Sequence, residues 1–527
     1  MELLVQFVRK VMPTVCLLGF LILLVRLFGV LVLNPYRLRW KLRKQGINGP
    51  PSSFLLGNVY EILNNNNNKS TPLISAGKHQ AELIINHSYS SLLFPCFEQW
   101  RQQYGSVFMF SLGNIQLVYM GDPGIVKEMC TCISLGFGKP SYQHKERGPL
   151  LGQGILTSNG TSWARHRKII APQLYLDKVK GMTKLMVEAS VVVLNSWQEK
   201  VEVSEGGVAD ITVDDYIRSF AGDAISRACF GSSYVEAQQI FMKLGALERA
   251  MLHRTIPTGV PLLFLNYLKN YKSNREMGRL GKEVRALILK AARERKTRRA
   301  PDKATETEPD LLRMMVEAGG EEENMLDNCL NMYLAGYEST ALSAAWTLML
   351  LASNPHWQDR VRSEVFHACG GRLPDADDLR RMKLLTMVIQ ESLRLYPPAP
   401  IVSREALQDL KFGHILIPKG VAVWIPLVTL HQDPDIWGPD AALFRPERFA
   451  QGATQACKLP QVYMPFGMGP RNCLGQHFAM AELKVILSRI LSTFSFTLSP
   501  DYVHSPVLKL SIKPQHGVRL RLKKLSD

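Results

Sequence analysis

One cysteine near the C-terminus lies in a sequence suited to metal chemistry. The run Pro465-Phe-Gly-Met-Gly-Pro-Arg471-Asn-Cys473-Leu-Gly places a thiol after a glycine-rich bend and before a helical segment expected from about Gln476. Glycines let a backbone approach a flat cofactor closely, backbone N–H groups can hydrogen-bond the sulfur, and Arg471 can neutralise an acidic group. The N-terminus of the following helix is expected to lower the pKa of the thiol. The loop therefore predicts that Cys473 presents a thiolate, the alternative being a structural cysteine beside a chance turn.

Charged and aromatic residues recur at helical spacing upstream of this loop. Glu391 and Arg394 lie three residues apart, which puts them on one face of a helix, and Arg448 follows in the sequence Pro-Glu-Arg-Phe. Trp163 and Arg167 lie four residues apart and share one face of another expected helix. Either pair alone could belong to any amphipathic helix, so each pair indicates a function only in combination with the cysteine loop.

Together these motifs resemble the cytochrome P-450 family of haem-thiolate monooxygenases, and the resemblance covers essentially the whole chain. It implies a mostly α fold with small β-sheets and a haem b whose iron is bound by Cys473, with O2 and NADPH-derived electrons as co-substrates. In the family, residues like Glu391, Arg394 and Arg448 form a buried ion-pair network that fixes the cysteine loop. The other residues that the resemblance assigns to haem binding are Phe466, Gly467, Arg471, Trp163, Arg167, Arg404, Ala335 and Gly336.

The sequence Ala335-Gly336-Tyr-Glu338-Ser339-Thr340 resembles a second motif of the family, the one that activates dioxygen. Gly336 is expected to allow a local distortion of its helix, which makes room for dioxygen and a water. The resemblance makes Glu338 the acid and Ser339 the hydroxyl of a catalytic proton relay. Serine stands where the family usually has threonine and lacks the methyl that stiffens χ1, so Thr340 could share this role.

Length and composition leave room for one large enzyme fold that positions these residues. The chain has 527 residues, 46% hydrophobic and 21% charged, which excludes a collagenous, disordered or disulfide-scaffold protein. Long helical patterns alternate with short strand-like pieces at 107–112 and 115–120. The most regular helix is expected over about 327–353, closed by Asn354-Pro355, and would reach about 40 Å, enough to cross the domain.

The N-terminus predicts a membrane anchor. Residues 11–33 are apolar except for Arg26, and as a helix of about 34 Å they could span a hydrocarbon core of about 30 Å. Basic residues follow at 37–44, so the positive-inside rule favours a single-pass protein whose catalytic domain faces the cytosol. The family resemblance implies that this membrane is the endoplasmic reticulum. A cleaved signal peptide is the alternative, but its apolar region is usually about 7–15 residues long.

Three regions follow from this organisation. Residues 1–33 are expected to form a luminal tip and the transmembrane anchor. Residues 34–93 are expected to hold a basic stop-transfer segment, a Pro-rich hinge at 48–52 and a polar surface loop around the asparagine run 64–68. Residues 94–527 are expected to form the haem-thiolate monooxygenase domain.

The distribution of basic residues helps to decide which kind of partner the protein binds. Lys and Arg outnumber Asp and Glu by 17, but the basic stretch 269–303 has the apolar spacing of an amphipathic surface helix. No nucleic-acid-binding motif accompanies it, so nucleic acid is excluded as a partner. No G-x-G-x-x-G follows a strand, so the resemblance implies that electrons come from a separate NADPH-cytochrome P-450 reductase, whose acidic face the basic surplus suits.

Further sequence similarity narrows the substrate. The stretches 137–140, 163–172, 177–182 and 225–234 resemble plant P-450 enzymes of the branch that includes gibberellin-modifying oxidases. The resemblance implies hydroxylation or epoxidation of an apolar terpenoid, a gibberellin or related diterpenoid acid first and triterpenoid acids as the alternative, although a family does not fix a substrate. The rivals are a membrane haem protein without turnover and a haem-thiolate isomerase or dehydratase. Intact Cys473, Glu338 and Ser339 argue against both.

Overall fold

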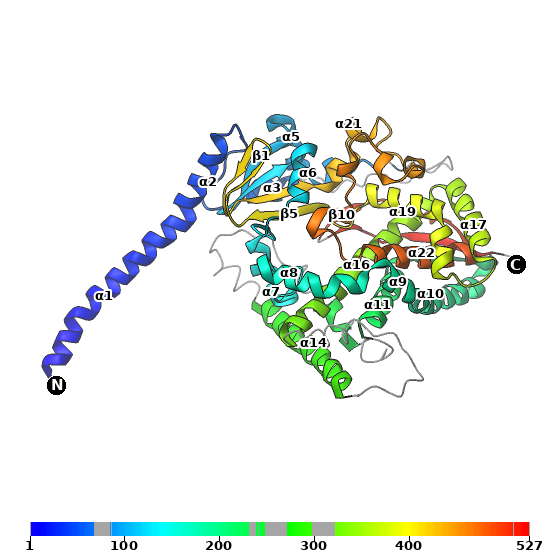
Figure 1. The fold of residues 1–527 in the computed structure, drawn as a ribbon, viewed down its shortest axis with the longest axis horizontal. Helices are drawn as coiled ribbons and strands as arrows, with labels where there is room; N and C mark the ends of the chain where they lie inside the picture. Colours follow the sequence, from blue (N-terminus) through cyan, green and yellow to red (C-terminus); the bar gives the residue numbers. More distant parts are fainter. Residues whose placement is uncertain are drawn as a thin grey trace.

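The computed structural model describes residues 2–67, 85, 87–230, 239–240, 242–247, 271–297, 322–509 and 511–525. Helices make up most of this part of the chain, and short strands form four small sheets. Figure 1 shows the strands β1 and β5 gathered where α2 meets the body, whereas the opposite side of the body is largely helical and includes α10, α11, α17 and α22. The predicted fold class, mostly α with small β-sheets, is confirmed.

A long N-terminal helix projects from the body (Figure 1). Helix α1 (Glu2–Phe28) continues through a π-helical turn (Gly29–Leu33) into α2 (Asn34–Arg43). Residues Val11–Arg43 are long and apolar enough to cross a membrane, with a mean hydropathy of 2.8, and their apolar window is not buried against the body. One N-terminal helix able to span a membrane was predicted and is present.

The base of this helix is fixed to the body. Leu42 is fully buried, and the guanidinium of Arg39 donates to the Ser111 hydroxyl at 2.7 Å and to the Pro50 carbonyl at 2.9 Å. The Pro-rich segment 48–52 lies along strand β1 (Val107–Leu112), because the Met109 N–H donates to the Asn48 carbonyl at 2.9 Å. The segment expected to act as a hinge is therefore hydrogen-bonded to the sheet.

The asparagine run departs from its prediction. Helix α3 (Val59–Asn67) continues through the first four asparagines, so the prediction of a surface loop is wrong for residues 64–67. Residue 68 and the polar sequence after it lie outside the described residues. The amphipathic helix expected in the basic stretch is present as α14 (Tyr271–Thr297), which buries Leu280, Val284 and Ile288.

The largest sheet of the described residues has five strands. Its order is β1-β2-β8-β5-β3, in which β2 (Ile115–Met120) pairs antiparallel with β1 and parallel with β8 (Ala422–Pro426). The bounds expected for β1 and β2 are confirmed. Strands β5 (Ile401–Ala406) and β3 (Phe137–Gly138) pair antiparallel at the other edge, and their register places Phe137 and Gly138 opposite Ala406 and Glu405.

Helix α16 (Glu322–Ala352) is the central element, and it contains nearly all of the helix expected over 327–353. It packs against α11 (Asp214–Phe230), α19 (Lys383–Leu395) and α22 (Gln476–Thr493). The distortion expected at Gly336 is absent, because α16 is a regular α-helix throughout. Gly336 instead permits close packing, since a Cβ there would lie 3.1 Å from the Ile225 side chain of α11.

One buried guanidinium joins several elements. Arg394 and Glu391 of α19 are both fully buried and are joined by two hydrogen bonds of 2.7 Å. The remaining N–H groups of Arg394 donate to three backbone carbonyls, those of His431, Ala441 and Leu443. Arg448 completes the cluster, with its Nε 3.4 Å from a Glu391 oxygen. The predicted ion-pair network is present.

The network also reaches the segment that enters the cysteine loop. His431, in α20 (Leu427–Gln432), accepts a hydrogen bond from the backbone N–H of Met464 at 3.2 Å. The Tyr463 hydroxyl donates to the Gln390 carbonyl of α19 at 2.9 Å. The chain just before Pro465 is thus tied to the two elements that Arg394 joins.

Two truncations should separate anchoring from stability. Removing residues 1–33 should release the protein from membranes with little change in melting temperature. Removing residues 1–44 also deletes Arg39 and Leu42, and loss of a buried leucine alone costs about 2–5 kcal/mol, so the melting temperature should fall by several degrees. Sedimentation with membranes and thermal denaturation measure the two effects. Equal melting temperatures would contradict a stabilising role for α2.

Arg394→Ala should strongly destabilise the fold. The substitution leaves the Glu391 carboxylate buried without its main partner, at a cost of about 3–5 kcal/mol. Arg394→Lys should rescue little, because an ammonium cannot make five hydrogen bonds in a fixed fork. Arg380→Ala is the control, since that side chain is 65% exposed and should change stability by less than about 0.5 kcal/mol. Denaturant unfolding measures all three, and wild-type stability in Arg394→Ala would refute the role given to the network.

Candidate functional site

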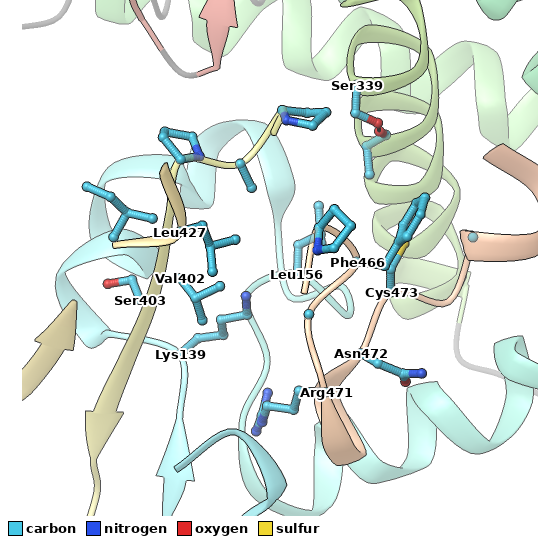
Figure 2. A pocket seen from close by; sticks show the side chains of 18 of the residues that line it. Lys139, Leu156, Ser339, Val402, Ser403, Leu427, Phe466, Arg471, Asn472 and Cys473 are labelled. Atoms are coloured by element: carbon cyan, nitrogen blue, oxygen red, sulfur yellow. Dashed lines mark hydrogen bonds between the residues drawn. The ribbon is translucent and has the colours of Figure 1, made fainter. Parts of the chain in front are cut away.

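A cavity of about 730 Å³ lies between α16, the cysteine loop and the inner edge of the five-stranded sheet. Most of its wall is apolar, and Figure 2 shows Leu156, Val402 and Leu427 on the side facing Ser339 of α16. Among the described residues that line it, none is a carboxylate. The charged lining residues are all cations: Lys139, Arg167, Arg404, Arg471 and Lys509.

Cys473 presents its sulfur to this cavity from the loop between the 3-10 turn η7 (Gly469–Arg471) and α22. Its N–H donates to the Phe466 carbonyl at 2.7 Å, which closes the loop on itself. Gly469 has a positive φ of 69°, and a Cβ there would lie 2.2 Å from the Cys130 carbonyl oxygen, so a side chain would push the loop away.

The pKa expected for the Cys473 thiol needs correction. Burial raises its pKa, and this effect exceeds the opposing influence of the Gly475 N–H group and of Arg167. The predicted lowering by the helix N-terminus is therefore wrong for the thiol considered alone. A metal ion bound to a cysteine deprotonates it outright, so the sulfur still suits a metal.

Three guanidinium groups converge beside the cysteine. Arg471 stacks over the Trp163 indole, 4.1 Å from the ring centroid, and Arg404 comes from strand β5. Burial, Arg404 and Arg167 together lower the pKa of Arg471 to about 10, and its buried Nη1 has no hydrogen-bond partner. Arg404 is buried, Arg167 and Arg471 are half-buried, and no described residue of the cavity lining is a carboxylate. Since a desolvated cation without an anion is costly, the cluster favours an anionic ligand. The two propionates of a haem supply two negative charges, and the residues present fit that group.

Arg167 lines the cavity and also contacts the cysteine loop. It lies on α8 (Gly160–Ile170) with Trp163, as the spacing predicts, and its guanidinium carbon is 5.9 Å from the Trp163 ring. Its Nη1 donates to the Asn472 carbonyl at 3.0 Å, and its Nη2 contacts the Asn472 side chain. Arg167 therefore holds the cysteine loop as well as lining the cavity.

Lys139 is a cavity residue that sequence reasoning did not assign to the site. Asn159 fixes its backbone, accepting from the Lys139 N–H at 2.7 Å and donating to the Lys139 carbonyl at 2.9 Å. Figure 2 shows its side chain pointing into the cavity above Arg471. The residue directly follows β3, a strand of two residues, which is too short to recognise from alternation.

The motif on α16 is divided between two faces of the helix. Ala335, Gly336, Ser339 and Thr340 line the cavity. The Ser339 hydroxyl donates to the Ala335 carbonyl at 2.5 Å, whereas the buried Thr340 hydroxyl has no hydrogen-bond partner.

Glu338 does not line the cavity. It pairs with Arg218 of α11 at 3.1 Å and with Lys513 of β11 (Ile512–Pro514). The structure thus brings the predicted hydroxyls together at the cavity but not the predicted acid, because consecutive residues of a helix point about 100° apart.

Comparison with known proteins assigns the family. The family model described as Cytochrome P450 matches residues 84–520. "Cytochrome P450 714C2" of Oryza sativa subsp. japonica is 47% identical, over 94% of this chain and 95% of that protein. "Cytochrome P450 714B3" of Zea mays is 43% identical, over 100% and 98%. "Cytochrome P450 714A2" of Arabidopsis thaliana is 41% identical, over 94% and 95%. The chain therefore belongs to the cytochrome P-450 family of monooxygenases, which use haem b, dioxygen and electrons from NADPH.

Proposed function

We propose that the protein is an enzyme of the endoplasmic reticulum membrane that inserts one oxygen atom from O2 into a terpenoid, a gibberellin or related diterpenoid acid. The observation that carries the proposal is one cavity with the Cys473 sulfur and an arginine cluster at one side and an apolar wall at the other. The N-terminal helix supports the membrane location. Similarity to plant relatives supports the kingdom.

Haem would be held by residues from four elements. The Cys473 sulfur would bind the iron, and Arg404, Arg471 and Lys139 would bind the propionates, with Arg471 held in place by the Trp163 ring. When bound, haem b supplies the reduction of dioxygen and the transfer of one oxygen atom to carbon. Phe466 and Gly467 shape the loop, whose reversal needs the positive φ of Gly467, 70°.

The residues of the chain position the substrate, exclude water from the cavity and move protons. The apolar wall that includes Leu156, Val402 and Leu427 places a C–H or C=C bond and excludes water. Ala335 and Gly336 leave space beside the helix because their side chains are small. The hydroxyls of Ser339 and Thr340 hold or move protons at the cavity surface. A hydroxyl in a fixed position can pass on the proton of a general acid.

Electrons come from outside the chain in this proposal. NADPH-cytochrome P-450 reductase is the proposed donor, and the excess of 17 positive charges suits an acidic docking face. The cavity lining contains no described carboxylate that would repel an acidic substrate, which favours terpenoid acids over cationic substrates.

Cys473→Ser should remove the thiolate ligand while changing little else. The reduced, carbon-monoxide-bound wild type should show the red-shifted absorption band of a thiolate haem, and the variant should lose it because an alcohol is a weaker donor. Cys457→Ser is the matched control, since Cys457 lies in the preceding segment and does not line the cavity. Retention of the band in Cys473→Ser would refute the assignment.

The substrate class can be tested directly. Microsomes containing the protein and reductase should convert at least one member of a panel of gibberellins, with NADPH-dependent gain of one oxygen atom detected by mass spectrometry. Triterpenoid acids in the same panel test the alternative, and turnover of those alone would replace the diterpenoid assignment. NADPH consumption without product from either class would contradict the proposed substrate class, and absence of NADPH consumption would contradict monooxygenase function.

A further inference from the structure

A loop beside the cavity is held through its backbone by side chains of α16. The loop, residues 151–157, begins at the last residue of α7 (Ser141–Leu151) and leads toward α8. Its residues Ile155 and Leu156 line the cavity, and Figure 2 shows Leu156 among the side chains of the cavity wall. Because backbone groups away from water need partners, the groups that pair with this loop also determine where those two side chains lie.

Three polar side chains on the N-terminal half of α16 each accept one backbone N–H group of the loop. The acceptor and donor pairs are Asp327 with Gln153 at 2.6 Å, Asn328 with Ile155 at 2.9 Å and Asn331 with Leu156 at 2.8 Å. The three acceptor residues are buried, and none is more than 4% exposed. Asp327 and Asn331 lie four residues apart, which places them one above the other on one face of the helix. This face of α16 therefore pairs with the loop as a neighbouring strand would.

Two glycines allow the loop to approach α16 this closely. Gly152 has a positive φ of 56°, and a Cβ there would lie 2.1 Å from a carboxylate oxygen of Asp327. A Cβ at Gly154 would lie 2.6 Å from the amide oxygen of Asn331. A side chain at either position would push the loop away from the helix, so the contact depends on both segments.

Asn331 bonds to the loop at two points. Its Oδ1 accepts from the Leu156 N–H, and its Nδ2 donates to the Leu151 carbonyl at 2.7 Å. The side chain is fully buried although the residue lines the cavity. Both polar atoms of its amide are thus engaged by the loop, and breaking these bonds would leave buried polar groups unpaired, which is costly. The geometry supports a role in holding the loop rather than in binding a polar group of the substrate.

We propose that Asn331 is a positioning residue for substrate selection, which clamps the loop at Leu151 and Leu156 and so fixes Leu156 in the apolar wall. The inference deepens the proposed monooxygenase function and rests on it, because the apolar wall places the bond that is oxidised. A small displacement of a positioning group changes which bond is oriented for reaction. Loss of the clamp should therefore relax the selection among ligands and among carbon atoms of one substrate.

Hydrogen exchange tests the clamp without turnover. Asn331→Leu keeps the branched shape of the side chain but removes both hydrogen bonds. Backbone exchange, measured by mass spectrometry on peptides that cover 151–157, should become about ten-fold faster, the factor that corresponds to one hydrogen bond. If Asn331→Leu does not fold, Asn331→Ala removes the same two bonds without bulk against the loop. Wild-type exchange of 151–157 in the folded variant would overturn the proposal.

Gln358→Leu is the matched control. This buried amide of α17 (Pro355–Cys369) accepts from the Phe496 N–H at 3.2 Å and donates to the Phe496 carbonyl at 2.8 Å, and it does not line the cavity. The variant should accelerate exchange around Phe496 and leave exchange of 151–157 unchanged. Faster exchange of 151–157 in Gln358→Leu would mean that general destabilisation, and not loss of the clamp, releases the loop, and would count against the proposal.

Nitrogen ligands of haem iron measure the shape of the cavity without a substrate. 4-Phenylimidazole carries a phenyl ring that can pack against the apolar wall, whereas imidazole carries none. Optical titration of Asn331→Leu should show 4-phenylimidazole binding roughly five-fold more weakly, because the wall is no longer held in place before binding, and imidazole binding as in the wild type. Unchanged binding of 4-phenylimidazole would overturn the proposal.

A double variant shows whether Asn331 acts through Leu156. Leu156→Ala should also weaken binding of 4-phenylimidazole. The variant that combines Asn331→Leu with Leu156→Ala should bind it no more weakly than Leu156→Ala alone, because both changes remove the same wall. Additive losses would mean that Asn331 contacts the ligand itself, and would overturn the positioning role.

Product analysis joins the clamp to the reaction. On any panel acid that is oxidised, Asn331→Leu should change the ratio of positional isomers, whereas Gln358→Leu should keep the wild-type ratio. An unchanged ratio in Asn331→Leu would overturn the proposal. If exchange and 4-phenylimidazole binding change as expected and no panel compound is oxidised, the proposed substrate has failed and the clamp has not.

Discussion

The cavity depends on the hydrogen bonds of one guanidinium that water does not reach. Arg394 saturates its donors with Glu391 and with three carbonyls from two separate segments, α20 and residues 441–443. Because an unpaired buried charge is far more costly than a paired one, those segments cannot move apart independently. His431, one of the acceptors, also accepts from the backbone just before the cysteine loop. The cluster of Glu391, Arg394 and Arg448 therefore makes the site rigid, although it does not line the cavity.

The cavity itself is the reverse case, since its charged lining residues are all cations and none of its described lining residues is a carboxylate. Burial is the largest cause that lowers the pKa of Arg167, Arg404 and Arg471, and the charges of Arg404 and Arg167 lower the pKa of Arg471 further. Aromatic stacking on Trp163 offsets part of that cost. An anionic cofactor removes the rest, so binding of such a cofactor and folding of this region stabilise each other.

Sequence reasoning reached residues whose role depends on local spacing or on a recognisable motif. Cys473, the pair Glu391 and Arg394, and the strands β1 and β2 were all predictable, because a glycine loop, an i,i+3 pair and alternation are visible over a few residues. Lys139 was not assigned to the site. Its backbone is fixed by the side chain of Asn159, which lies 20 residues further along the chain.

Helical geometry explains why the sequence identified the motif on α16 but did not predict which of its side chains face the cavity. Three consecutive residues, Glu338, Ser339 and Thr340, point about 100° apart in turn. The first meets the cations of α11 and β11, the second bonds to its own helix, and the third faces α22. Which of them serves the cavity is decided by what packs around the helix, since the sequence of a helix fixes the angles between its side chains but not the identity of its neighbours. A motif that names an acid and a hydroxyl therefore leaves open which of its side chains reach the cavity, and here Ser339 and Thr340 reach it whereas Glu338 turns to cations on neighbouring elements.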